Sequence, residues 1–599
     1  MVAVQRHRGP DDEGIYIDDK SGIALGHNRL SIIDLSNAGH QPMQNASGNL
    51  YLVFNGEIYN HHELRQELSS YSFSSKTDSE VILAAYEKWG TDCVQKFIGM
   101  FAFAIWDTAK NSLFCARDRL GIKPFHWHQD QSHFLFGSEI KALLAGGVVP
   151  APDWQSWSHY LRDGYYDHSD RTFFATIKSL APGHFMVVQN GKVTESCYWR
   201  LEEHCHASSD ISVGEAVEKF RNLLTDSIDL RLRSDVPVGV NLSGGLDSAS
   251  LFSIVDRIRE KSNPLHAFTA AYGDKRYDED SYADQVVSLS EVRQTVDQLT
   301  PEVMQQELGT AIWHQEAPIG GVATVGYHTL HRTIRDNGIK VSLEGQGVDE
   351  MLAGYAYFKP PYYSDLMAQG KFMALRQELR SGNQANHELQ TLRDYRNDSK
   401  PPKYQDGTNF LASDCISADL KTAGFPRSTF YKPFEDALTN ALYRDLRHTK
   451  LPRVLRMNDR LSMAFGIELR EPYLDHRLVE FAFGLPSTMK IHQGVSKYLL
   501  RQAMSDHLPR DIVNTPKRAV VTPQREWLRH ELRTFVSDLI NSKSFASRNL
   551  FDPVAVKKKF EEFCRGVGDN SFFVWQWVNT ELWFRQFCPD SAFPSKFRS

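Results

Sequence analysis

A glycine-rich loop between a short apolar strand and an amphipathic helix constrains this chain more than any other feature. The stretch VPVGVNLSGGLDSAS (residues 236–250) predicts a strand, then a loop over residues 243–248, then a helix that begins at once. The first N–H groups of such a helix are unpaired, and the positive end of its dipole faces the loop. The loop therefore predicts an anion site of the phosphate type, at the end of a strand in an α/β sheet.

The same residues also fit an ordinary Ser or Asp cap on a helix that follows a glycine turn. Gly244 and Gly245 would let the backbone approach a phosphate closely, and the hydroxyls of Ser243 and Ser248 add donors. The Asp247 carboxylate suits such a site only where Mg²⁺ bridges it to the phosphates. The sequence contains neither G-x-x-x-x-G-K-[ST] nor G-x-G-x-x-G, so the P-loop and Rossmann fingerprints are absent.

Two domains follow from the order of the predicted elements, because 599 residues exceed what one hydrophobic core supports. Residues 1–198 contain short strands in quick succession with two helical stretches, which predicts an α+β layer domain. Residues 213–590 alternate helices with brief apolar strands, which predicts an α/β domain with a parallel sheet. The polar stretch between residues 197 and 213 is the expected linker.

Two further segments carry expectations of their own. Residues 380–410 are polar and contain Pro and Gly, which indicates an excursion or a mobile segment within the second domain. Residues 572–587 (FFVWQWVNTELWFRQF) repeat aromatic side chains at steps of three and four, which predicts a helix that faces the core or an interface.

Charge and cysteine usage exclude several classes of partner. Lys and Arg number 68 against 74 Asp and Glu, a net charge of −6 without a basic block, so nucleic acid is not an expected partner. Seven scattered cysteines without C-x-x-C fit a reducing compartment, and the cytoplasm is the expected location. No apolar run approaches the ~18 residues of a membrane span, and the first residues lack the apolar region of a secretory signal. We expect no membrane association.

The loop SGGLDS resembles the pyrophosphate-binding signature of the ATP-pyrophosphatase superfamily, and other motifs narrow the match. EGQGVDE (344–350), RMNDRLSMAFGIELREPYLDHRLVEFA (456–482) and SKYLLRQAM (496–504) are similar to the synthetase domain of the glutamine-dependent asparagine synthetases. RHRGPDDEG (6–14), NRLSIIDLS (28–36), FNGEIYNHHELR (54–65), TDSEVIL (77–83) and RDRLGIKPF (117–125) resemble the class II, Ntn-type glutaminase domain of that family. The resemblance covers roughly residues 5–520 and implies an Ntn-type β-sandwich layer domain before an ATP-pyrophosphatase-like α/β domain.

In the first domain, the resemblance implies a pocket that binds glutamine. Asn55 and Gly56 would donate N–H groups to a tetrahedral oxyanion. Arg29 would hold the substrate carboxylate in a bidentate grip, and Glu57 and Asp78 would pair with the substrate ammonium.

In the second domain, the resemblance implies a site for ATP with Mg²⁺. Asp247 and Asp349 would be the Mg²⁺ ligands, since carboxylates suit a hard cation between phosphates. Lys497 would stabilise charge that develops on the α-phosphate as pyrophosphate departs. The residues expected to bind ATP and pyrophosphate are Leu242, Ser243, Gly244, Gly245, Asp247, Ser248, Ala270 and Gly345, of which Leu242, Ala270 and Gly345 would lie near the nucleoside.

The chain departs from the family pattern at its N-terminus. An Ntn glutaminase of this class uses an N-terminal Cys as nucleophile, whereas residue 2 is Val and the first cysteine is Cys93. In the family a strand and a helix precede RHRGP, so typical element lengths predict that roughly 20 residues are missing here. The alternatives are a truncated chain or a late start, which we favour, and a degenerate glutaminase as in the β-lactam synthetases. Either way, we expect no glutamine hydrolysis by the chain as given.

Position 346 is the second departure. The family usually carries Glu here, as the group that helps bind the acceptor and deprotonate the attacking ammonia, whereas this chain carries Gln346. An amide has no useful basicity at neutral pH, so amination here would depend on ammonia that is already deprotonated or on a different base. We expect Gln346→Glu to raise the amination rate at neutral pH.

The expected function is that of a ligase. It would adenylate aspartate to β-aspartyl-AMP and aminate it to asparagine, with glutamine, or ammonia in this Cys-less chain, as nitrogen donor. Amidation of another carboxylate such as a sugar acid, or a β-lactam-type cyclisation, remains open. A catalytically silent binding subunit is the alternative of a different class. The expected partners are small-molecule substrates, and the oligomeric state stays open, with a homodimer as one option.

Overall fold

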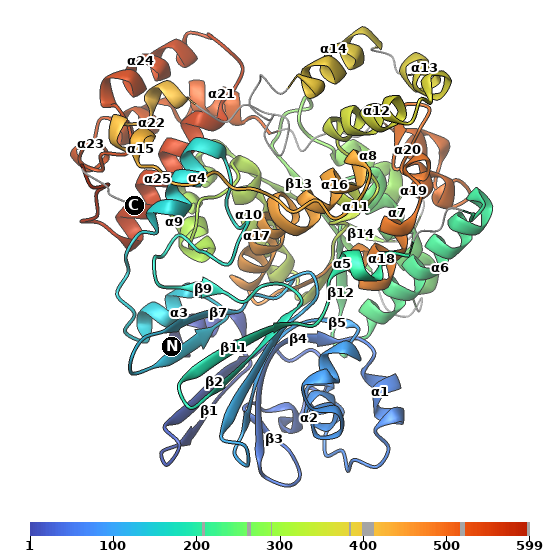
Figure 1. Cartoon of the computed structure of the whole chain (residues 1–599), viewed down its shortest axis with the longest axis vertical. Coiled ribbons are helices and arrows are strands. Elements are labelled where there is room, and N and C mark those ends of the chain that lie inside the picture. Colours follow the sequence, from blue (N-terminus) through green and yellow to red (C-terminus); the bar gives the residue numbers. More distant parts are fainter. Residues whose placement is uncertain are drawn as a thin grey trace.

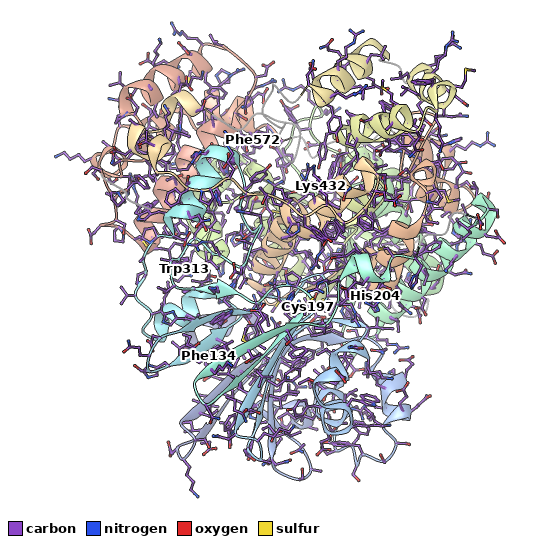
Figure 2. The ribbon with its side chains drawn as sticks, viewed as in Figure 1. Phe134, Cys197, His204, Trp313, Lys432 and Phe572 are labelled. Carbon is purple, nitrogen blue, oxygen red and sulfur yellow. The ribbon has the colours of Figure 1, made fainter. Side chains whose placement is uncertain are left out.

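The computed structural model describes residues 1–206, 210–259, 265–288, 290, 292–381, 385–397, 412–515 and 522–595. Figure 1 shows a strand-rich N-terminal domain as the lower half, in blue to teal, and a helix-rich second domain as the upper half. Figure 2 places Cys197 and His204 where the chain crosses from the lower to the upper half. The expected linker contains one short helix, α5 (Leu201–His204).

A six-stranded sheet in the order β11-β10-β6-β5-β4-β3 forms the centre of the N-terminal domain. Its pairs are antiparallel, and Phe54 of β4 lies opposite Phe103 of β5. Successive side chains of a strand point to opposite faces, so the apolar run of β5 serves two cores. Phe101 and Phe103 pack on the face covered by helices, and Ala102 and Trp106 pack on the other face.

Two smaller sheets and two helices complete the layers. Helices α1 and α2 contribute to the core on one face, and the sheets β1-β2 and β8-β7-β9 contribute to the core on the other. The predicted α+β layer domain is confirmed. The bounds are β1 Asp12–Asp18, β2 Ile23–Arg29, β3 Met43–Gln44, β4 Leu50–Ile58, α1 His61–Glu67, α2 Asp78–Trp89, β5 Gly99–Asp107, β6 Ser112–Arg117, β7 His126–Gln129, β8 Phe134–Gly137, α3 Ile140–Ala145, α4 Trp154–Asp163, β9 Lys178–Ser179, β10 His184–Gln189 and β11 Lys192–Cys197.

A five-stranded parallel sheet in the order β14-β13-β12-β15-β16 organises the second domain. From β12 the chain adds β13 and β14 on one side, then returns to add β15 and β16 on the other. The order reverses next to β12, and ligands of open α/β sheets bind beyond the carboxyl ends of the strands at such a point. The predicted parallel sheet is confirmed, and its topology directs attention to the loop after β12.

Helices surround this sheet on both sides (Figure 1). The bounds in the second domain are α6 Val213–Leu232, β12 Val238–Asn241, α7 Leu246–Ile258, β13 His266–Ala271, α8 Asp280–Val287, β14 Arg293–Gln298, α9 Pro301–Gln315, α10 Val322–Asp336, β15 Val341–Leu343, α11 Val348–Met351, α12 Lys359–Ala368, α13 Phe372–Ser381, α14 Ala385–Arg396, α15 Ala418–Thr422, α16 Ala437–Arg444, α17 Leu451–Met463, β16 Glu468–Arg470, α18 His476–Gly484, β17 Ile491–His492, β18 Val495–Ser496, α19 Tyr498–Met504, α20 Arg510–Asn514, α21 Gln524–Arg529, α22 Arg533–Ile540, α23 Lys543–Ser547, α24 Pro553–Cys564 and α25 Phe572–Phe587.

The segment 380–410 contains the end of α13 and all of helix α14, which covers residues 385–396. The expectation of an excursion or a mobile segment stays a prediction. Residues 382–384 and 398–411 lie outside the described residues.

The aromatic C-terminal helix shares a core with the N-terminal domain. Trp577 and Trp583 of α25 are buried, and the Trp583 ring lies 4.9 Å from the Trp157 ring of α4, centroid to centroid. In Figure 1 the cyan helix α4 lies among the red C-terminal helices. The predicted core-facing helix is confirmed, and it joins segments more than 400 residues apart. In the described part of the chain, no helix has both the length and the apolar composition needed to span a membrane.

Arg470, at the end of β16, lies fully buried between the two domains. Its Nη2 donates to Glu57 Oε2 at 3.0 Å, and its Nε donates to Glu468 Oε1 at 2.8 Å. Its Nη1 donates to the carbonyl oxygens of Arg231 and Arg233, each at 2.7 Å. One side chain therefore joins β4 of the first domain to α6 and β16 of the second.

We expect Arg470→Met to lower the free energy of unfolding by about 3–5 kcal/mol, because it leaves two buried carboxylates without their cation. Urea denaturation followed by tryptophan fluorescence measures the change. Arg200→Met is the matched control, since Arg200 pairs with Glu203 while 54% exposed and should contribute at most ~1 kcal/mol. Equal losses in the two variants would show that the buried contacts of Arg470 add nothing.

Candidate active site

The predicted glycine-rich loop lies directly after β12 and begins α7. The N–H of Ser243 donates to Ser248 Oγ at 3.2 Å, and the two hydroxyl oxygens are 3.1 Å apart. The N–H of Gly245 donates to Ser243 Oγ at 3.4 Å. The hydroxyls thus brace a turn that opens onto the N-terminus of a 13-residue helix, which is the arrangement that binds phosphate.

Close packing explains why glycine occupies positions 244 and 345. Gly244 has φ +76°, and a Cβ there would lie 2.6 Å from the backbone nitrogen of Ala283. A Cβ on Gly345 would lie 3.3 Å from the backbone nitrogen of Ser248, so the chain after β15 packs directly against the loop after β12. Both strand ends therefore contribute to one site.

Lys497 lies between the two predicted metal ligands. Its Nζ is 2.6 Å from Asp247 Oδ2 and 2.5 Å from Asp349 Oδ1. Its backbone has φ +56°, a left-handed conformation that costs energy for a residue with a side chain and that clusters at functional sites. The structure thus brings together three residues from separate parts of the sequence, at the edge where the glycine-rich loop ends.

The two carboxylates fit a hard cation. Asp247 Oδ1 is buried and has no hydrogen-bond partner among the described residues. A buried, unsatisfied carboxylate oxygen is costly unless a ligand completes it, and oxygen donors are what Mg²⁺ prefers. No group of three or more His, Cys, Asp or Glu that could hold a metal occurs within the described ranges. Further ligands for a metal here would have to come from a bound phosphate or water.

The remaining predicted nucleotide residues lie on the same sheet. Leu242 follows β12, is buried, and accepts from the Thr269 hydroxyl through its carbonyl at 2.8 Å. Ala270 lies on the neighbouring strand β13, opposite Asp297 of β14. Leu242 directly precedes the loop and Ala270 lies on the neighbouring strand, and their contact with a nucleoside stays a prediction.

Gln346 lies beside a carboxylate that the sequence analysis did not single out. Its Nε2 donates to Glu344 Oε1 at 3.1 Å. Asn458 Nδ2 donates to Glu344 Oε2 at 3.2 Å and to Glu471 Oε1 at 3.5 Å. The structure therefore places a carboxylate beside the amide at position 346, from the side chain two residues upstream.

Burial makes Glu344 and Glu471 weaker acids than usual. Burial raises the pKa of Glu344 to about 7, and the polar side chains of Gln346, Tyr327 and Asn241 offset part of the rise. Burial raises the pKa of Glu471 to about 8. An acidic residue directly after an apolar strand, at the edge where the loop lies, was the signal in the sequence for Glu344.

A cavity of about 570 Å³ opens in the N-terminal domain. Its lining includes all five residues predicted for a glutamine pocket, namely Arg29, Asn55, Gly56, Glu57 and Asp78. Figure 2 labels Phe134, another lining residue, in the strand-rich half of the molecule. The structure thus gathers these five residues around one space of suitable size for a small molecule.

Hydrogen bonds and close packing fix the other three predicted residues of the cavity. Arg29 Nη1 donates to the Ser36 carbonyl at 2.8 Å, and Nη2 donates to the Asp34 carbonyl. Asn55 Nδ2 donates to Ser138 Oγ at 3.4 Å. Gly56 has φ +144°, and a Cβ there would lie 2.1 Å from the Met100 carbonyl oxygen, so this strand position requires glycine.

Two carboxylates form the acidic wall. Burial, together with repulsion from Asp78, raises the pKa of Glu57 well above its usual range, and Arg470 opposes the rise. Burial raises the pKa of Asp78 to about 6, although the N–H of Ile58 donates to its Oδ2 at 2.8 Å. Such a pair favours a cation that would restore both negative charges.

None of the seven cysteines, all of which the structure describes, lines this cavity. Cys93, the first in the sequence, is fully buried, and burial raises the pKa of its thiol far above the usual range. A buried thiol of this kind is a poor nucleophile.

Comparisons with known proteins agree with both halves of the structure. A model of the asparagine synthase family matches residues 219–585, and a model of the glutamine amidotransferase domain matches residues 1–199. The second match agrees with the layered, Ntn-type arrangement of the N-terminal domain.

Three curated relatives span most of the chain. "Asparagine synthetase [glutamine-hydrolyzing] 1" of Bacillus subtilis is 28% identical, with 96% of this chain and 91% of the relative covered. "Asparagine synthetase [glutamine-hydrolyzing] 3" of the same organism is 32% identical, with 86% and 82% covered. "Amidase chyE" of Penicillium rubens is 30% identical, with 93% and 89% covered.

Gly354 closes the space behind the lysine and was not predicted. A Cβ at this position would lie 1.7 Å from Asp349 Oδ1 and 2.3 Å from Lys497 Cε. We expect Gly354→Ala to displace both side chains and to lower ATP-dependent pyrophosphate release on the order of 100-fold, as misplacement near the reacting atoms typically does.

Gly214→Ala is the control for Gly354→Ala, because Gly214 lies on α6 and a Cβ there would meet nothing within 4 Å. The measurement compares the rate of pyrophosphate release by the two variants and the wild type. Normal release by Gly354→Ala would mean that Asp349 and Lys497 need not keep the positions described.

Proposed function

The chain belongs to the asparagine synthase family, and on that premise we propose that it is an ATP-dependent ligase that amidates aspartate to asparagine through β-aspartyl-AMP. One observation carries the proposal: Lys497 contacts both Asp247 and Asp349 beside a helix N-terminus fitted to phosphate. Cation, carboxylates and loop are what cleavage of ATP between its α- and β-phosphates requires.

Each group has a separate task in the proposed adenylation. The loop from Ser243 to Ser248 binds the departing pyrophosphate through backbone N–H groups and hydroxyls. The Lys497 ammonium stabilises negative charge on the α-phosphate as the bond to pyrophosphate breaks. Asp247 and Asp349 would hold Mg²⁺, which supplies charge neutralisation of the phosphates when bound.

The acceptor is the less constrained part of the proposal. Relatives of similar identity carry names of asparagine synthetases and of an amidase. Gln346 at the usual Glu position also leaves room for another acceptor, such as a sugar acid, or for a cyclisation of the β-lactam kind. Aspartate is favoured because the family model covers residues 219–585 and two relatives are named asparagine synthetases.

The N-terminal cavity suits an amino acid with an ammonium group. Burial raises the pKa of its acidic pair, Glu57 and Asp78, so that a bound cation would favour their charged forms, and Arg29 lines the same cavity. We propose that it binds glutamine. We further propose that residues 1–198 and 213–590 are the units that carry the two tasks.

We expect Asp247→Asn to lower pyrophosphate release on the order of 100-fold or more, because the amide is nearly isosteric but neutral, and loss of a metal ligand costs several kcal/mol of transition-state stabilisation. Asp336→Asn, at an exposed surface pair with Arg335, is the matched control. Release from ATP and aspartate at the wild-type rate by Asp247→Asn would refute the assignment. Absence of pyrophosphate release by the wild type would instead favour a silent binding subunit.

We expect the 599-residue chain to form amide from ammonium salts and not from glutamine, since no thiol lines the cavity. Asparagine and glutamate are measured with each nitrogen source in turn. Glutamate release from glutamine by this chain would contradict the expectation. A chain extended upstream by a segment that begins Met-Cys should gain glutamine-dependent activity.

A further inference from the structure

Position, burial and one hydrogen bond place Glu344 in the candidate active site. It follows β15 directly, and its neighbour Gly345 packs against the phosphate loop, so it lies at the ligand-binding edge of the sheet. Its carboxylate is 4% exposed. Its Oε1 accepts from Gln346 Nε2 at 3.1 Å, the side chain that stands where the family places its acid.

The hydrogen bonds of Glu344 hold its carboxylate beside position 346. Its Oε1 accepts from Gln346 and its Oε2 accepts from Asn458. The side chains of Tyr327 and Asn241 also interact with the carboxylate. A small donor such as ammonia that reaches position 346 would therefore meet Glu344.

We propose that Glu344 is the proton acceptor for the attacking nitrogen, in place of the carboxylate that position 346 lacks. The inference rests on the proposed amide-forming function, and it holds for any carboxylate acceptor that this site adenylates. Gln346 then has a positioning role, because its Nε2 is committed to Glu344 and its carbonyl oxygen is left to accept from ammonia.

The step balances without a further reactant. The nitrogen lone pair forms a bond to the acyl carbon of the adenylate, and the bond from that carbon to the phosphate oxygen breaks. AMP leaves with the electron pair. The proton lost by the nitrogen passes to the Glu344 carboxylate, and the product is the neutral amide.

The charged surroundings set the direction of the pH dependence. Around Glu344 stand Tyr327 on α10, Asn241 on β12 and Asn458 on α17, with Glu471 after β16 and Lys123 beyond it. Tyr327 stays neutral, since burial raises its pKa well above the usual range. Because burial raises the pKa of Glu344 to about 7, the group accepts protons above pH 7 and loses this ability as the pH falls through 7.

Two nearby carboxylates are weaker candidates for the same task. Glu471 reaches Glu344 only through Asn458, at 3.5 Å and 3.2 Å, so it lies one residue further from Gln346. Glu350 accepts from the Tyr355 hydroxyl at 3.0 Å and directly follows Asp349. Neither contacts position 346 in the described structure.

The decisive experiment compares two nucleophiles in Glu344→Gln. Hydroxylamine is largely unprotonated at neutral pH and attacks acyl-adenylates readily, whereas ammonia needs a base. We expect the variant to aminate with ammonium about 100-fold more slowly than the wild type, which is within the range of general-base effects. Hydroxamate formation and pyrophosphate release should stay within a few-fold. Equal loss with both nucleophiles, or no loss with ammonium, would overturn the proposal.

A relocation variant guards against a folding defect. Glu344→Gln combined with Gln346→Glu moves the carboxylate by one hydrogen-bond length, and we expect it to restore at least a tenth of the ammonium activity. Glu471→Gln is the control variant, and the pH dependence of its amination rate should keep its midpoint near pH 7. Failure of the double variant to aminate while it still releases pyrophosphate would count against the proposal, as would loss of the neutral pH dependence in Glu471→Gln.

The wild-type chain supplies a test that needs no variant. At constant free ammonia, the amination rate should rise through about pH 7, and hydroxamate formation should stay level over the same range. A parallel rise with both nucleophiles would overturn the role of Glu344. Absence of ATP-dependent pyrophosphate release with every carboxylate tried would instead overturn the proposed function, so the two failures are distinct.

Discussion

The contacts of the Arg470 guanidinium hold the two halves of this molecule in one geometry. It meets Glu57 on the wall of the N-terminal cavity, Glu468 on its own strand and two carbonyls at the end of α6. Burying a guanidinium is costly unless every donor finds a partner. These partners exist only when β4, α6 and β16 are all in place, so the cation ties the assembly of the parallel sheet to the docking of the first domain. The carbonyl of Arg470 also accepts from the Glu344 N–H at 3.0 Å, which joins the same strand to the amination site.

This dependence explains which strands the sequence could predict. Strands β4, β5 and β12 can be predicted from alternating or continuous apolar residues, because hydrophobic burial drives their placement. Strand β16 reads Glu-Leu-Arg and is nonetheless buried throughout, since ion pairs rather than apolar contacts satisfy it. Strand β14 is polar because it forms an edge of the sheet with one neighbour. Local pattern carries no information about a partner that lies more than 400 residues away in sequence.

The candidate site also contains residues that the local sequence predicts and residues that only long-range contacts reveal. The glycine-rich loop is contiguous, so strand, turn and helix could be inferred from residues 236–250 alone. Asp349 and Lys497 needed the family resemblance, and the structure then brought them within 2.5 Å of each other. Glu344 and Gly354 escaped both arguments, because their importance lies in what they contact. A glycine matters at 354 since a carboxylate and a lysine fill the space where its side chain would be.

The buried carboxylates near the phosphate loop affect both the folding stability of the chain and the proposed amination. Glu344 has a pKa of about 7 in the folded chain, above its value in an unfolded one, so the native state binds more protons between about pH 4.5 and 7. The stability that this proton provides is complete below the unfolded pKa and is lost as the pH rises through 7. Glu471, with a pKa of about 8, adds a loss of the same sign at slightly higher pH. The proposed amination needs Glu344 ionised, and hence needs the form in which the fold is weaker. A site that keeps a buried base in this way trades folding free energy for basicity near neutral pH.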